Sequence, residues 1–278
     1  VEAFLALGVV FASVAIPLGL DDQWTTAAWA MEGAALVWVG VRQERRLARW
    51  LGLLLQAGAG IFFLESLAVA RPAPPVVNGI YLGGLLISAA GLFSGVYLFL
   101  HGRALLERER VLSAPVALWG LLWWLGMGWI EILRHAPKSD QTALIAGFTA
   151  LSLLAVARAY RRLQWPVMVT PLLGLLPLLF ALGLQTLTGA IFGRGGQGHL
   201  LSGAGLVAWP LAAAVQYRLL FEAGDKWPAP LPTIWHTLTL LLMTAAATVE
   251  ADWLLGELLM ATDGWRLAVV MLLFALPL

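Results

Sequence analysis

The sequence has 278 residues, of which 60% are hydrophobic and only 12% are charged, and its formal net charge is +1. An average soluble domain is about a quarter charged, so the composition excludes a soluble enzyme. The abundance of apolar residues also excludes a disordered chain, and no basic surface is large enough for nucleic-acid binding. The fold class that the composition predicts is instead all-α, a polytopic bundle of transmembrane helices.

Apolar runs follow one another along the whole chain. A helix needs about 20 apolar residues to cross a bilayer, and the runs lack the alternation of barrel strands, so helices are the expected spanning form. Short connections between the runs predict helical hairpins. The ten runs, in chain order, are 4–20, 25–41, 48–70, 78–100, 113–133, 141–160, 167–188, 199–220, 232–254 and 265–278.

The two ends of the sequence lie close to apolar runs. The chain starts at Val1 without Met and stops at Leu278 inside the last run. We therefore expect one transmembrane domain over residues 1–278, cut from a longer membrane protein whose missing spans would be its partners, together with the lipid bilayer. The first run lacks the basic start and the cleavage site of a signal peptide.

Basic residues mark the expected orientation. Most Lys and Arg residues lie in alternate connections, at 42–49, 103–110, 158–162 and 218–226. The excess of Lys and Arg in cytoplasmic loops predicts that these four connections are cytoplasmic. Their regular recurrence is compatible with repeated two-helix hairpins, although any multi-pass protein with short loops would show a similar spacing.

Small residues and prolines are spaced in ways that bear on helix packing. Glycines recur four residues apart, as at Gly91 and Gly95, which predicts close helix–helix approach. Pro171 and Pro177 interrupt the run 167–188, which predicts a bend or break in that helix.

Glu32 is the acid nearest the middle of a span. It lies roughly 12 Å below Trp24 along a helix. A charge in hydrocarbon is costly, so such a residue is a candidate for function. Ala28, Ala35 and Leu36 share its helix face, which indicates contact with another helix rather than with lipid.

Other acids gather toward the outer ends of their spans. One interpretation is an outward-facing cavity that accepts a cation, a proton or a polar headgroup. The other is that these carboxylates are hydrated at the interface and mark helix ends. The candidates, with Arg194 as a base that could pair with them, are Glu65, Glu131, Glu250 and Asp252.

Two further patterns bear on ligand binding. The stretch 193–198 matches G-x-G-x-x-G, but it joins two spans rather than a strand and a helix, so we reject a dinucleotide site. An anion site around Arg194 and a plain flexible turn both remain open. Without cysteines, and with scattered histidines, we expect no metal and no cofactor.

Residues 16–64 resemble a known family. The helix Trp29-Ala-Met-Glu-Gly33 and the exit Gly40-Val-Arg42 are similar to a motif of the predicted membrane proteins grouped as domain of unknown function 2339, with Met31 where Leu is usual. The resemblance implies a bacterial inner-membrane protein with more spans and no assigned reaction. It also favours the positions that match the motif as candidate functional residues, namely Trp29, Glu32, Gly33 and Arg42.

Three functions remain open at this point. The first is transport or handling of a small solute or lipid through a site that includes Glu32 and Trp29. The second is a scaffold or assembly subunit without catalysis, in which Glu32 pairs with a base to fix helix register. The third is a membrane-embedded transferase that acts on a lipid-linked substrate at the outer face through Asp21 and Asp22. No nucleophile–base pair is evident, so we lean against an enzyme.

Overall fold

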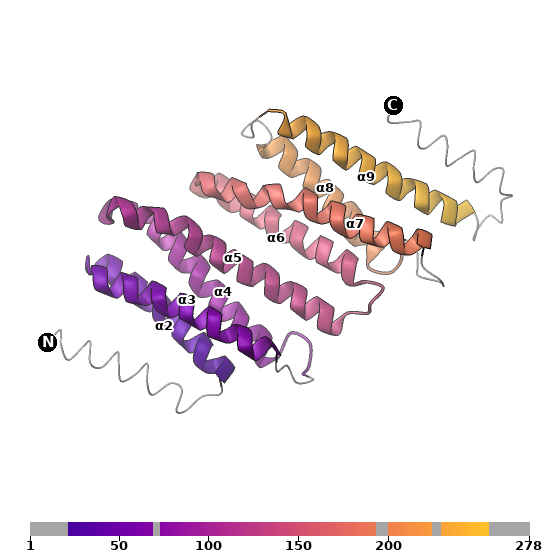
Figure 1. Ribbon diagram of the computed structural model, residues 1–278. Coiled ribbons are helices and arrows are strands. Elements are labelled where there is room, and N and C mark those ends of the chain that lie inside the picture. The colour runs from indigo at the N-terminus through magenta and orange to yellow at the C-terminus, as the bar shows by residue number, and fades with distance from the viewer. Residues whose placement is uncertain (1–21, 69–72, 193–199, 224–228, 256–278) are drawn as a thin grey trace. The chain divides into compact units, whose positions relative to one another are not determined.

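The computed structural model describes residues 22–68, 73–192, 200–223 and 229–255, and Figure 1 shows the course of the chain. Within these ranges the regular structure is entirely helical, which confirms the predicted all-α class. The chain divides into two compact units, residues 1–135 and 136–278. Each is described by itself, and the expectation of one transmembrane domain stays a prediction.

The described residues of the first unit form four long helices. α2 packs against both α3 and α4, and α4 packs against α5, while a short 3-10 helix, η1, precedes α5. The amide oxygen of Asn78 accepts a hydrogen bond from the backbone N–H of Tyr81 at 2.8 Å, which caps the start of α4. The bounds are α2 (Asp22–Arg42), α3 (Arg46–Ala68), α4 (Gly79–Leu100), η1 (Gly102–Ala104) and α5 (Glu107–His135).

Glycines allow the helices of the first unit to approach closely. A Cβ added to Gly33 of α2 would clash with the carbonyl oxygen of Gly52 in α3, and the reverse substitution would clash in the same way. Gly91 of α4 meets Gly120 of α5, where an added Cβ would lie 2.9 Å from the Gly120 Cα. Close packing through small residues, as predicted, is therefore what joins these helices.

The second unit is built around α6. It packs against α8 and against η2, whereas α7 packs against α9. The predicted run 167–188 is divided into a 3-10 segment and an α-helix. Pro171 lies inside the 3-10 segment, where a proline has no N–H for an α-helical hydrogen bond. The bounds are α6 (Gln141–Leu163), η2 (Pro166–Gly174), α7 (Leu175–Phe192), α8 (Gly205–Ala223) and α9 (Leu231–Trp253).

The number of membrane spans is lower than predicted within the part of the chain that the structure describes. The runs 4–20 and 265–278 lie outside it, and the other eight coincide with helical segments. Among the described residues, six helical segments are long and apolar enough to cross a membrane, and α2 and α8 are not among them. Both are long enough, but α2 carries Thr25, Thr26 and Glu32, and α8 carries Gln216 and Arg218. The prediction of about ten spans is therefore not confirmed.

Candidate functional site

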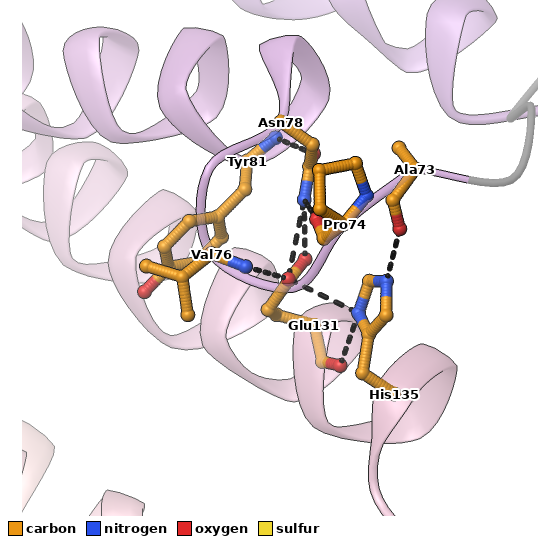
Figure 2. A network of polar contacts seen from close by, with 7 residues as sticks. All are labelled: Ala73, Pro74, Val76, Asn78, Tyr81, Glu131 and His135. Carbon is orange, nitrogen blue, oxygen red and sulfur yellow. Dashed lines mark hydrogen bonds and ion pairs between the residues drawn. The ribbon is translucent and has the colours of Figure 1, made fainter.

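Glu131, one of the acids predicted to lie toward the outer ends of the spans, binds the connection before α4. It lies near the end of α5 with an exposed fraction of 8%. Its Oε1 accepts hydrogen bonds from the backbone N–H of Val76 at 2.6 Å and from Asn78 Nδ2 at 3.2 Å. Figure 2 shows how this carboxylate holds the connection that precedes α4. The carboxylate therefore ties α5 to the residues that start the neighbouring helix.

His135 completes this network one helical turn later. Its Nδ1 lies 3.0 Å from Oε1 of Glu131 and 3.2 Å from the carbonyl oxygen of Glu131. Its Nε2 lies 3.0 Å from the carbonyl oxygen of Ala73. All three neighbours are oxygen atoms, one from the Glu131 side chain and two from backbone carbonyls. The imidazole thus lies between the end of α5 and the connection.

Val76 adopts a backbone conformation that such a residue rarely takes. Its φ is 65°, in the left-handed region, where a β-branched side chain is an outlier. Strain of this kind costs of the order of 1–3 kcal/mol and persists where the surroundings hold it in place. The hydrogen bond from its N–H to Glu131 is one of the interactions that hold it.

A buried ion pair joins the starts of α3 and α5, at the other end of α5 from Glu131. Arg49 of α3 and Glu109 of α5 are 3% and 5% exposed. Nη2 of Arg49 lies 2.8 Å from Oε2 of Glu109, and Nε lies 3.3 Å from Oε1, so the guanidinium binds the carboxylate with two nitrogens. Nη1 donates to the carbonyl oxygen of Gly40 at 2.9 Å. One side chain thus joins α2, α3 and α5.

Gln56 lies buried between these two ends of the unit. It is 3% exposed, and its amide and the hydroxyl of Ser94 in α4 are 2.9 Å apart, in hydrogen-bonding contact for either orientation of the amide. The hydroxyl of Ser88 donates to the carbonyl oxygen of Gly120 in α5 at 2.8 Å. Polar side chains in the interior of the first unit therefore link neighbouring helices.

Trp29, Glu32 and Glu65 have different environments. Glu32 lies midway along α2 and is half-buried, with its Oε2 shielded from solvent. Trp29 is half-buried and packs edge-on against Phe62, with ring centroids 6.4 Å apart. Glu65 is exposed on α3. Glu32 is therefore nearer the middle of a helix than Glu131, as predicted.

The acids of the second unit also contact connections. Oε1 of Glu250 in α9 accepts a hydrogen bond from the backbone N–H of Leu201 at 3.0 Å. Oδ1 of Asp140 accepts from the backbone N–H of Ala204 at 3.4 Å. Asp252 is half-buried near the end of α9. The carboxylates of Glu250 and Asp140 thus accept hydrogen bonds from the backbone of the connection before α8.

Some predicted residues fall outside the described ranges. Arg194 and the whole stretch 193–198 do so, and so does Asp21. The side chain of Asp22 is likewise not described. The anion site and the transferase acids therefore stay predictions. Among the described residues, no group of three or more His, Asp or Glu side chains is arranged to hold a metal ion.

The comparison with known proteins covers the whole chain. A family model for the predicted membrane proteins of DUF2339 matches residues 1–278. The chain belongs to the DUF2339 family. No curated protein and no solved structure matches it. The resemblance seen over residues 16–64 therefore extends to both units, and with it the assignment as a membrane protein.

Several acids of this DUF2339 chain share one structural role. Glu131 and Glu250, like Asp140, each accept a hydrogen bond from the backbone of a connection, and Glu109 accepts from the backbone N–H of Leu106 at 3.2 Å. Sequence reasoning missed the partners Asn78 and His135, and it placed Arg49 in the basic connection 42–49, which it expected to be cytoplasmic. The available signal was that Arg49 falls inside the apolar run 48–70.

Proposed function

We propose that this DUF2339 chain is a membrane scaffold without catalysis, in which buried polar pairs fix helix register and hold the connections. The observation that carries the proposal is the double contact of Arg49 with Glu109 and Gly40. Glu131 plays the corresponding part at the other end of α5. Both carboxylates already accept hydrogen bonds from groups of the same unit.

The physical argument is that a buried charge must be paired. A charged side chain at membrane depth or in a packed interior is strongly destabilising without a partner. A pair that forms in only one helix register therefore disfavours the other registers. Arg49 and Glu109 are more than nine-tenths buried, so a shift of α3 along α5 would leave both without a partner.

The proposed scaffold lies in the bacterial inner membrane. The excess of Lys and Arg supports a cytoplasmic position for the connections at 42–49 and 103–110. The ends of α3 and α5 that carry Arg49 and Glu109 would then face the cytoplasm. The network around Glu131 would face the opposite side.

A second candidate function is the handling of a small solute or lipid through Glu32. The observation that favours it is the position of this carboxylate, midway along α2 with Oε2 shielded from solvent. An ionisable residue at such a depth is a common feature of transport sites. The neighbouring Trp29 would form part of the same site.

Thermal unfolding in mild detergent tests the scaffold against this alternative. The full-length protein is compared with Glu32→Gln and with Glu65→Gln, which alters an exposed acid on the adjacent helix. The scaffold predicts a lower melting temperature for Glu32→Gln only, with no stabilisation by added solutes or lipid headgroups. A solute that raises the melting temperature of the wild type and of Glu65→Gln, but not of Glu32→Gln, would favour the second candidate.

A further inference from the structure

The two basic connections of the first unit lie side by side. The turn after α2 is tight, since the backbone N–H of Arg45 donates to the carbonyl oxygen of Gly40 at 2.9 Å. The pair Arg49–Glu109 joins the start of α3 to the start of α5. Val41, Leu98 and Leu105 pack into one buried cluster beneath both connections. Residues 42–46 and 102–110 therefore form one end of the unit.

This end carries positive charge that the described residues do not neutralise. Glu109 compensates Arg49, and both are buried. Glu44 and Glu107 are exposed acids of the same two connections. Arg45 is exposed as well. Four other exposed arginines form no ion pair with the described residues; we call them the arginine cluster, and they are Arg42, Arg46, Arg103 and Arg110.

One guanidinium of the arginine cluster is held in place by an aromatic ring. Cζ of Arg42 lies 5.3 Å from the centroid of the Trp38 ring, in a cation–π contact. Trp38 is 40% exposed, and Trp50 of α3 is 46% exposed. Exposed Trp side chains next to arginines are typical of the level of lipid headgroups.

An exposed apolar stripe of α3 begins directly beside the cluster. Leu47, Leu51 and Leu54 are 86%, 44% and 65% exposed, and with Trp50 they recur at the three- and four-residue spacing of one helix face. Arg46 is the residue just before this stripe. Positive charge and apolar surface therefore adjoin in the order in which a lipid presents its phosphate and its acyl chains.

We propose that the arginine cluster binds the phosphate of an anionic phospholipid, with the acyl chains along the exposed stripe of α3. A guanidinium presents parallel N–H donors that match two phosphate oxygens. A zwitterionic lipid offers the same phosphate with a cationic group that the arginines repel. The charge of the cluster therefore favours a lipid with net negative charge. This inference does not depend on the scaffold or on Glu32.

Native mass spectrometry of the full-length protein, delipidated in a neutral detergent, tests the proposal. The protein is titrated with phosphatidylglycerol, with phosphatidylcholine and with inorganic phosphate. The wild type is compared with Arg42→Gln/Arg46→Gln. The matched control is Arg158→Gln/Arg162→Gln on α6, which removes two exposed arginines at the same spacing.

The expected result is tighter binding of phosphatidylglycerol than of phosphatidylcholine by the wild type. Each guanidinium removed weakens the affinity for phosphatidylglycerol about fivefold, so the affinity of Arg42→Gln/Arg46→Gln falls about 25-fold. The control variant binds phosphatidylglycerol as the wild type does. Equal binding of the two lipids, or the same loss in both variants, would overturn the proposal. So would displacement of the lipid by inorganic phosphate, which would assign the cluster to a free anion. Arg103→Gln/Arg110→Gln repeats the test from the other connection if the first variant does not fold.

Discussion

The guanidinium of Arg49 and the carboxylate of Glu109 meet at 2.8 Å, with both side chains buried between α3 and α5. The two residues are 60 positions apart in the sequence. Because the guanidinium also donates to the carbonyl oxygen of Gly40, this contact fixes the relative height of three helices. It is the strongest single indication that buried charge in this chain serves structure.

Breaking this pair on one side is expected to be much more damaging than removing both charges. Arg49→Met or Glu109→Gln alone leaves a buried group without its partner, and we expect a loss of about 3–5 kcal/mol. Arg49→Met/Glu109→Leu removes both charges, and its stability should lie much closer to the wild type. Thermal or denaturant unfolding in detergent measures the difference. Single variants as stable as the wild type would show that the pair contributes little.

The contact between Gly33 and Gly52 gives a second prediction. Gly52→Ala places a methyl group against the backbone of α2, and overpacking of this kind destabilises by about 1–3 kcal/mol. The control is Gly58→Ala on the same helix, where an added Cβ meets no atom within 4 Å. We expect Gly58→Ala to leave stability unchanged or slightly raised. Similar losses for both variants would contradict close packing of α2 on α3.

Glu131 is expected to control the local stability of residues 73–78. Glu131→Ala removes the acceptor of the Val76 N–H and the carboxylate that contacts the His135 imidazole. Amide hydrogen exchange, read by mass spectrometry, should become faster in the peptide that contains Val76. Glu65→Ala, which alters an exposed acid, serves as the control. Unchanged exchange in Glu131→Ala would mean that other contacts hold this connection.

The orientation of the helices between Gln43 and Ser139, α3 to α5, can be measured by chemical labelling. This sequence contains no cysteine, so single cysteines can be introduced at Gln43 and at Ser139, which are both exposed. In a background free of other cysteines, a membrane-impermeant thiol reagent applied to intact cells should label Ser139→Cys and spare Gln43→Cys. The reverse pattern would invert the proposed topology.

Much of the helical architecture follows from local sequence. Apolar runs locate the described helices because hydropathy and length are properties of single segments. The glycine contacts at Gly91 and Gly120 were accessible in part, since small residues at helical spacing indicate close approach. Pro171 marked the interruption that became η2, although the 3-10 conformation itself was not foreseen.

The polar contacts were much less predictable. Asn78 and His135 each acquire their role from Glu131, and the pairing of a connection with a helix end depends on tertiary packing. Arg49 has the same residue type and a similar position as its exposed neighbours in the basic connection. Only the fold distinguishes it, because α5 brings Glu109 to that point.

We propose that the buried carboxylates of this membrane protein serve its structure rather than a bound ligand. Native mass spectrometry of the full-length protein in gentle detergent, with wild type beside Glu32→Gln, tests it most directly. The scaffold predicts the same set of bound molecules in both spectra, with the variant less stable to heat. A lipid or small solute that the wild type retains and Glu32→Gln loses would contradict the claim and place a ligand site at Glu32.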